Sequence, residues 1–271
     1  MYPASFRYWR ASTVHEAEQM FNSASDPRYV AGGQSLIPAM KQRLANPSDL
    51  IDLSRISGLS FIRRDGERLV IGAGTRHADV AASAEAQRAI PALAHLAGLI
   101  GDPAVRHRGT LGGSIANNDP AADYPAAVLA LDAVVTTNRR NIPAGAFFTG
   151  MFETALQEGE IVTEVTFPLA ARAAYMKFPN PASRYAMPGV FVAEHGKSVR
   201  VAVTGAAACV YRAAELESAL SGQFRPQSMT DVTIRADEFT SDLFASAEYR
   251  ANLVKVMAQR AVGSMLSSRN G

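Results

Sequence analysis

The sequence predicts an α+β protein of two domains, and three features carry this prediction. The chain has 271 residues, more than the usual single domain of about 150 residues. Residues 28–53 show the pattern of strand, glycine loop, helix and strand, which is typical of an α/β unit. Beyond residue 174, three strand patterns precede two helical ones, which favours an antiparallel sheet covered by helices.

Capping and turn signals locate the elements of the first half. Thr13 and Glu16 stand three residues apart before an apolar-periodic stretch, and this capping box predicts a helix over 13–22. Asp65-Gly66 predicts a β-hairpin, because these residues tolerate the positive φ of a tight type I′ turn. The other patterns predict strands at 28–31, 50–53, 61–64, 69–71, 133–137 and 160–167, and helices at 36–44, 76–86, 92–100 and 126–131. Residues 101–125 are rich in turn formers and show no periodicity.

A bland segment over 170–174 indicates the domain boundary, which divides the chain into residues 1–174 and 175–271. The second domain is expected to contain an antiparallel sheet, because its strand patterns are short and one pair is joined by a tight turn at 195–197. The expected strands are 174–178, 189–193 and 199–204, and the expected helices are 213–221 and 247–263.

Composition excludes several classes of protein. A hydrophobic content of 48% permits a packed core, and a net charge of +2 without a basic tract argues against a nucleic-acid partner. The single cysteine, Cys209, rules out an internal disulfide framework and an iron–sulfur cluster held by this chain alone. Neither a secretory signal nor an apolar run of about 18 residues is present, so we expect a cytoplasmic protein without an integral membrane segment.

Two glycine-rich loops are the main candidates for ligand binding. The first covers residues 31–36 at a strand-to-helix junction, and the second covers residues 108–114. Paired glycines let backbone N–H groups converge without interference from Cβ atoms, which suits an anion such as a diphosphate. The alternative is that each pair is only a tight turn. Arg106 and Arg108, beside the second loop, could neutralise phosphate charge or could be solvated. If the loops bind one diphosphate, they lie together although they are far apart in the chain.

Other candidate groups are weaker. Asp119 precedes Pro120 as a turn former, and Asp123 could accept hydrogen bonds from sugar hydroxyls. The five histidines lack the spacing of a metal site, and no Gly-x-Ser-x-Gly motif is present. We therefore predict no catalytic residue and no metal ligand.

Four longer motifs carry a family resemblance. They are residues 31–41 with Asp52-Leu53, residues 106–115 running into 117–123, residues 147–153 with 159–164, and residues 246–253. Together they resemble the FAD-binding medium subunit of the molybdenum hydroxylase family, which includes xanthine dehydrogenase and aerobic carbon monoxide dehydrogenase. The resemblance spans nearly the whole chain.

The resemblance implies a fold, a cofactor and partners. The fold would be a PCMH-type FAD-binding domain of two α/β subdomains over 1–174, followed over 175–271 by a carbon monoxide dehydrogenase flavoprotein-like C-terminal domain with a three-stranded antiparallel sheet and helices. The cofactor would be FAD. The partners would be a large molybdopterin-containing subunit and a small [2Fe-2S] subunit, in a heterotrimer or a dimer of heterotrimers.

The resemblance also implies the residues that hold FAD. Asp123 would bond ribose or ribityl hydroxyls, Ile161 would pack near the isoalloxazine edge, and Lys177 would stabilise the anionic reduced ring. Tyr185 would shield the flavin, or alternatively fill the core. The full set is Ala31, Gly32, Gly33, Gln34, Ser35, Leu36, Thr110, Leu111, Gly112, Gly113, Ser114, Ile115, Asp123, Ile161, Lys177 and Tyr185.

Three functions are compatible with these residues. The first is an electron-transfer subunit that passes electrons from an iron–sulfur partner to an external acceptor. The second is a stand-alone FAD oxidoreductase with its own substrate pocket, and the third is a nucleotide-binding scaffold without redox turnover. For either flavoprotein, valine at Gly33 or Gly113 is expected to abolish FAD retention, because a side chain would occupy the space of the diphosphate.

Overall fold

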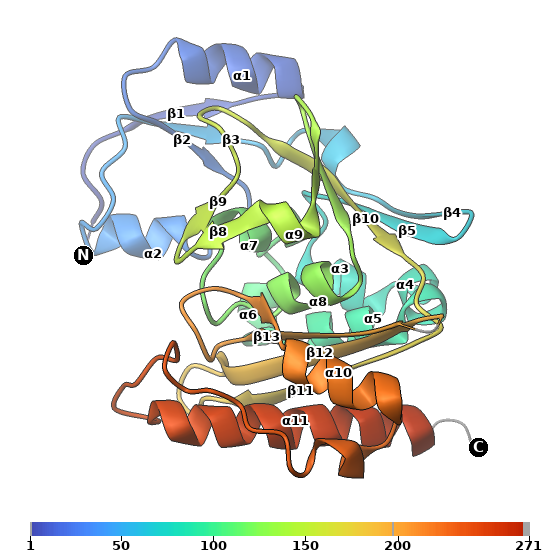
Figure 1. Ribbon diagram of the computed structural model, residues 1–271. Coiled ribbons are helices and arrows are strands. Elements are labelled where there is room, and N and C mark those ends of the chain that lie inside the picture. The colour runs from blue at the N-terminus through green and yellow to red at the C-terminus, as the bar shows by residue number, and fades with distance from the viewer. Residues whose placement is uncertain (1, 197, 268–271) are drawn as a thin grey trace.

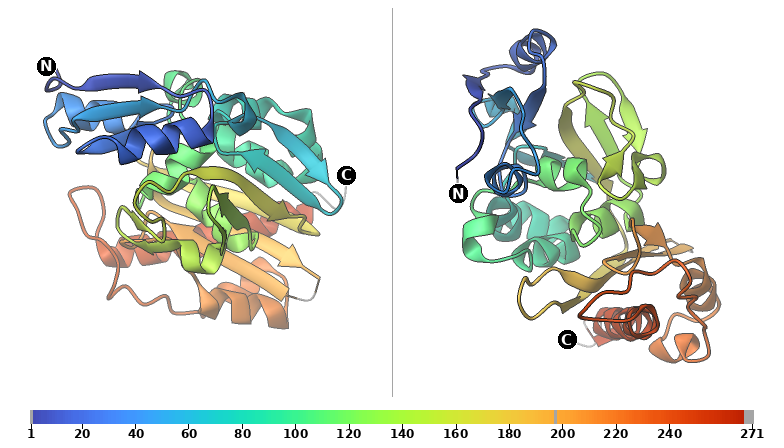
Figure 2. Two further views of the ribbon diagram at one scale, coloured as in Figure 1. Left: turned by 90° about the horizontal axis from the view of Figure 1, so that it is seen from above. Right: turned by 90° about the vertical axis from the view of Figure 1, so that its left-hand side faces the viewer.

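The computed structural model describes residues 2–196 and 198–267. Figure 1 shows an N-terminal α/β subdomain at the top, a second subdomain in the middle, and a C-terminal sheet with long helix α11 at the base. The two views of Figure 2 show the same succession of units along the chain. The α+β fold class predicted from the sequence is confirmed.

The first subdomain is a parallel sheet with strand order β1-β3-β2. Thr13 caps the first helix, as predicted, because its side chain accepts the backbone N–H of Glu16. The other half of the capping box differs, since the Glu16 carboxylate accepts the N–H of Ser12 instead of that of Thr13. The sequence patterns missed β1, since all four of its residues are exposed on an edge strand and show no apolar alternation. The elements are β1 (Arg7–Arg10), α1 (Val14–Asn22), β2 (Pro27–Val30), α2 (Leu36–Lys41) and β3 (Asp49–Asp52).

The second subdomain is built on a sheet with strand order β4-β5-β10-β6-β7. An antiparallel hairpin joins β4 to β5, as predicted, but its turn residues are Gly66 and Glu67, because Asp65 pairs with Arg68 as the last residue of β4. Of these residues only Gly66 has a positive φ, so the predicted type I′ turn at Asp65-Gly66 was wrong. The strands are β4 (Ile62–Asp65), β5 (Arg68–Gly72), β6 (Val134–Thr137), β7 (Asn141–Pro143), β8 (Phe148–Gly150), β9 (Glu153–Thr154) and β10 (Val162–Pro168). The helices are α3 (His77–Ala82), α4 (Ala84–Ala89), α5 (Pro91–Gly98), α6 (Pro103–Arg106), α7 (Leu111–Asn117), α8 (Tyr124–Ala130) and α9 (Ala144–Phe147).

One helix prediction for this subdomain was wrong, and helices form in a stretch for which the sequence predicted no element. The single helix expected over 76–86 is two helices, because Ser83 leaves helical geometry and caps α4 by accepting the N–H of Ala86. The turn-rich stretch 101–125 contains α6 and α7, and α8 starts in it. Helix α7 was missed because two of its seven residues are glycines, which are poor helix formers.

The C-terminal unit is an antiparallel sheet with strand order β11-β12-β13-β14 and helices α10 and α11 on one face. Its elements are β11 (Arg172–Pro179), β12 (Ala186–His195), β13 (Ser198–Thr204), β14 (Tyr211–Arg212), α10 (Ala214–Gly222) and α11 (Ala247–Ser267). The short strand β14 extends the expected three-stranded sheet, and β11 already begins inside the segment expected to be a bland connector. In the expected turn at 195–197, residue 197 lies outside the described residues.

Strand β12 explains how the C-terminal unit attaches to the rest. Val190 and Val192 face α10 and α11, whereas the alternate residues Phe191 and Ala193 pack into the core that also holds α5 and α8. The sheet is therefore buried on both faces and shares a core with the second subdomain. The division into residues 1–174 and 175–271 stays a prediction. Within the described residues no helix is long and apolar enough to cross a membrane.

Candidate functional site

A large cavity of about 1180 Å³ opens between the units. The first subdomain contributes residues 28–36 and 52–55 to its wall, the second subdomain contributes residues from α3, α7 and the segment 160–162, and the C-terminal unit contributes Tyr185. The cavity is large enough for a ligand of dinucleotide size.

The first glycine loop presents unused donors to this cavity. Strand β2 ends at Val30 and α2 begins at Leu36, and between them Gly33 has a φ of +73°, a conformation that favours glycine. Within residues 2–196 and 198–267, the backbone N–H groups of residues 32–36 donate no hydrogen bond. Consecutive free N–H groups in such a turn form an anion-binding concavity.

The structure changes the reason for the expected sensitivity of Gly33. A Cβ at this position would lie 3.0 Å from Cγ1 of Ile37 and 3.6 Å from Cγ2 of Val30, so it would meet side chains of the protein itself. A side chain at Gly33 is therefore disfavoured mainly by the positive φ, and it disturbs the loop instead of filling the diphosphate space.

The second glycine loop is held by the protein itself. The N–H of Gly112 donates to the carbonyl of Ala73, and the N–H of Gly113 donates to the side chain of Thr110, which caps α7. A Cβ on Gly112 would lie 2.5 Å from Cβ of Ala73, so this glycine permits close packing. The donors at Gly112 and Gly113 are thus occupied, and the free backbone donors at the site come chiefly from the first loop.

The two loops touch each other, as the sequence analysis expected. A Cβ on Gly32 would lie 2.2 Å from the carbonyl oxygen of Arg108 and 2.7 Å from Cα of Gly109. Only backbone-to-backbone contact fits in this space, so Gly32 lets the first loop lie against the segment that precedes α7. The hypothesis that both loops enclose one ligand site is consistent with this contact.

Most of the predicted site residues line the cavity. Leu111 and Ile115 do not, because their side chains are fully buried in the core under α7. Lys177 is buried beside Asp123 and reaches the site through that carboxylate. The predicted residues that line the cavity are Ala31, Gly32, Gly33, Gln34, Ser35, Leu36, Thr110, Gly112, Gly113, Ser114, Asp123, Ile161 and Tyr185.

Asp123 is the centre of a buried polar group that links two units. Its carboxylate lies 3.0 Å from Nζ of Lys177 and accepts the Tyr175 hydroxyl at 2.5 Å. Lys177 also donates to the carbonyl of Leu99. Burial raises the pKa of the Asp123 carboxyl, and the Lys177 ammonium opposes this effect. Sequence reasoning missed Tyr175, which has no motif around it and is recognisable only from its contact in the fold.

Tyr185 stands at the rim of the cavity. It is 48% exposed, which argues against the alternative role as core filler. The turn before it is fixed by Asn180, whose side-chain oxygen accepts the N–H groups of Ala182 and Ser183 and whose N–H donates to the carbonyl of Tyr185. The shielding of a flavin by Tyr185 stays a prediction.

Arginines supply positive charge at the cavity, and of those in its wall sequence reasoning singled out Arg108 but not Arg55 or Arg76. Arg55, Arg76 and Arg108 line the wall, and in the described part of the chain their side chains make no hydrogen bond or ion pair. Arg106, by contrast, donates to the carbonyls of Ile100 and Gly101. Unpaired guanidinium groups beside free backbone N–H groups suit a diphosphate. The residues present therefore fit a dinucleotide such as FAD.

His77 is another residue that the sequence did not single out. It lines the cavity, packs against the Tyr124 ring, and its Nδ1 is buried without a partner among the described residues. Burial, with a smaller contribution from nearby Arg106, lowers the pKa of His77 to about 4. The imidazole is therefore neutral at neutral pH and adds no charge to the site.

Comparison with known proteins identifies the family. Residues 4–170 match the model of the FAD binding domain in molybdopterin dehydrogenase, and residues 173–265 match the CO dehydrogenase flavoprotein C-terminal domain. The chain belongs to this family. It is thus an FAD-binding flavoprotein of the molybdenum hydroxylases, which are oxidoreductases. The resemblance stated from the sequence motifs is confirmed.

Individual relatives are similar to this chain over almost their whole length. The carbon monoxide dehydrogenase medium chain of Hydrogenophaga pseudoflava is 36% identical, over 97% of this chain and 98% of its own. The 6-hydroxypseudooxynicotine dehydrogenase complex subunit alpha of Paenarthrobacter nicotinovorans is 34% identical, over 98% and 96%. A solved structure of carbon monoxide dehydrogenase from Hydrogenophaga pseudoflava matches with a TM-score of 0.89 and 35% identity, over 98% of this chain and 99% of its own.

Proposed function

We propose that this flavoprotein relays electrons from an iron–sulfur subunit to an external acceptor. Bound FAD supplies a ring that takes up electrons and passes them on. The proposed partners are a large molybdopterin-containing subunit and a small [2Fe-2S] subunit, in a heterotrimer or a dimer of heterotrimers. The names of relatives as a medium chain and as a subunit of a dehydrogenase complex support the presence of partners.

The free N–H groups of the first glycine loop inside the cavity are the observation that supports the binding of FAD, on which the proposed relay depends. We propose that residues 32–36 hold the diphosphate of FAD through their backbone N–H groups, and that Arg108 offsets part of the negative charge of the diphosphate. The remaining residues predicted from the family, among them Asp123, Ile161 and Tyr185, line the same cavity and are proposed to surround the rest of the cofactor. The chain's work is to bind and orient the cofactor and to set the charge around it.

The test compares the chain alone with the assembled enzyme. We expect the purified chain to carry FAD in a one-to-one ratio, to be bleached by dithionite, and not to be reduced by carbon monoxide, aldehydes or N-heterocycles. The [2Fe-2S] subunit is obtained from cells that express the genes of the proposed partner subunits, and is then reduced. Mixed with the chain in a stopped-flow instrument, this reduced subunit is expected to bleach the bound flavin.

Each other outcome selects another function. Bleaching of the isolated chain by one of these substrates would show the stand-alone FAD oxidoreductase. A chain that binds ADP but retains no flavin would be a nucleotide-binding scaffold. A flavin that is not bleached by the reduced iron–sulfur subunit would refute the proposed relay. The division at residue 174 and the cytoplasmic location also stay predictions.

A further inference from the structure

The segment 157–161 joins the two subdomains at the cavity wall. Glu160 and Ile161 both line the cavity. The Ile161 side chain, only 2% exposed, packs into the apolar cluster of the first subdomain with Ala17 and Ile51. Glu160, the preceding residue, turns toward the second subdomain. Neighbouring residues of this segment are therefore anchored on opposite sides of the site.

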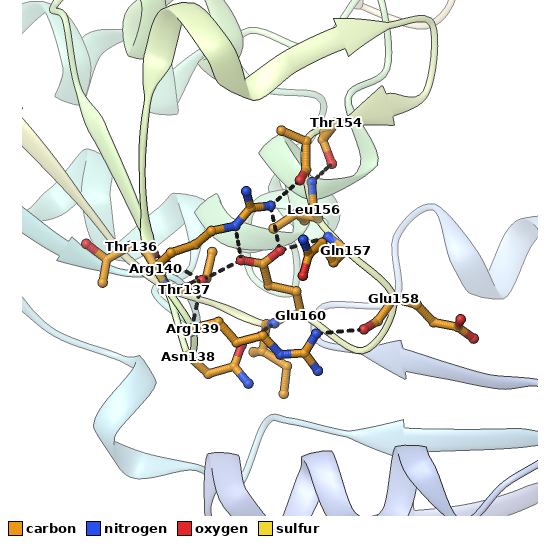
Figure 3. A network of polar contacts seen from close by, with 12 residues as sticks. Thr136, Thr137, Asn138, Arg139, Arg140, Thr154, Leu156, Gln157, Glu158 and Glu160 are labelled. Carbon is orange, nitrogen blue, oxygen red and sulfur yellow. Dashed lines mark hydrogen bonds and ion pairs between the residues drawn. The ribbon is translucent and has the colours of Figure 1, made fainter.

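Figure 3 shows how Glu160 is held. Its Oε1 lies 3.0 Å from Nε of Arg140 and accepts the Thr137 hydroxyl at 2.7 Å. Its Oε2 accepts Nη2 of Arg140 at 3.0 Å and the backbone N–H of Gln157 at 2.7 Å. Arg140 thus makes a two-pronged ion pair, which fixes orientation as well as distance.

These four contacts leave the carboxylate without a free position. A carboxylate has about four acceptor sites, and the protein occupies all of them. The hydrogen bond from Arg140 is the main cause that lowers the pKa of Glu160 to about 2, so the group stays ionised at neutral pH. Glu160 therefore neither donates a proton nor binds the ligand directly, although it borders the cavity.

The neighbouring residues complete the anchor. The Ile161 N–H donates to the Asn138 side chain at 2.8 Å, and the Asn138 N–H donates to the Ile161 carbonyl at 3.0 Å. On the other side, the Tyr29 hydroxyl donates to the Gly159 carbonyl. The segment is thus tied to β6 and its following turn and to the first subdomain at the same time.

We propose that Glu160 is a positioning residue of the FAD site, which holds segment 157–161 through Arg140 and Thr137 so that Ile161 forms the cavity wall between the subdomains. The inference rests on the proposed binding of FAD in this cavity. If the ion pair is lost, the wall at Ile161 moves relative to the first glycine loop. Bound FAD is then held less tightly and sits in a changed environment.

The experiment compares Glu160→Gln with a matched control, Glu217→Gln. Glu217 also receives a two-pronged ion pair, from Arg212, and a backbone N–H, from Val201, but it lies on α10 away from the cavity. FAD release is measured by the recovery of flavin fluorescence after dilution, and the bound flavin is recorded by visible circular dichroism. If Glu160→Gln does not fold, Arg140→Lys replaces it in the experiment, because lysine keeps the positive charge but cannot form the bidentate ion pair with Glu160.

We expect FAD release from Glu160→Gln, or from Arg140→Lys, to be at least about tenfold faster than from Glu217→Gln, with an altered visible dichroism spectrum. A merely structural role would lower the thermal midpoint of both glutamine variants and leave the release rate and spectrum as in the unaltered chain. Equal release rates in the two variants would overturn the inference. An unaltered chain that holds no FAD would instead refute the proposed function.

Discussion

Gly32 offers a quantitative test of the contact between the two glycine loops. In Gly32→Ala the new Cβ would lie 2.2 Å from the Arg108 carbonyl oxygen, and both partners are backbone, so the loops must separate. Overpacking of this kind costs about 1–3 kcal/mol. Because each 1.4 kcal/mol is a factor of ten in Kd, FAD affinity is expected to fall by about 5- to 150-fold if the separation opens the diphosphate site.

The assay is FAD titration of deflavinated protein, followed by quenching of flavin fluorescence. Gly58→Ala is the matched control, because a Cβ there meets no atom within 4 Å and Gly58 lies outside the cavity wall. We expect the control to bind FAD as the unaltered chain does. A Gly32→Ala protein with the affinity of the control would show that the contact does not shape the site.

Three further predictions follow from the site. Gly33→Ala places a side chain at a φ of +73° and is expected to weaken FAD binding about tenfold, measured by the same titration. Tyr175→Phe removes a hydrogen bond from buried Asp123 and is expected to lower the free energy of unfolding by about 1–3 kcal/mol, whereas an unchanged urea midpoint would contradict the contact. The pKa of His77 is lowered to about 4 in the folded chain, so between pH 6.5 and pH 4 the unfolded chain binds more protons than the folded one. The free energy of unfolding is therefore expected to fall as the pH is lowered through this range, and to fall less steeply in His77→Gln.

Local signals located most of the regular elements. The N-cap at Thr13 and the hairpin between β4 and β5 depend on residues near in sequence, and both occur in the structure, although the turn lies at Gly66-Glu67, one residue later than predicted. Strand β1 and helix α7 were missed for the opposite reason. Edge strand β1 pairs with β3, which lies far along the chain, and α7 packs through Gly112 against Ala73. Local propensity does not record such distant partners.

The candidate site divides in the same way. Its glycine loops are contiguous motifs, and the residue pattern alone indicated them. Asp123 and Tyr185, which also line the cavity, were predicted through the family resemblance. Arg55, Arg76 and His77 were not found, because a single arginine or histidine has no spacing that distinguishes a cavity wall from a solvated surface. Tyr175 and the Glu160–Arg140 pair became visible only when the fold brought their partners together.

The sequence by itself determined the fold class, the two glycine loops and the family, because patterns and motifs of residues close together in the chain indicate each of them. The tertiary structure decided that the first loop keeps its N–H groups free while donors of the second are occupied, and that Asp123 is paired with Lys177 from another unit. Each hydrogen-bond donor or charged group is paired with the groups that the fold places beside it. Which of them remain available to a ligand therefore depends on contacts that no local pattern specifies.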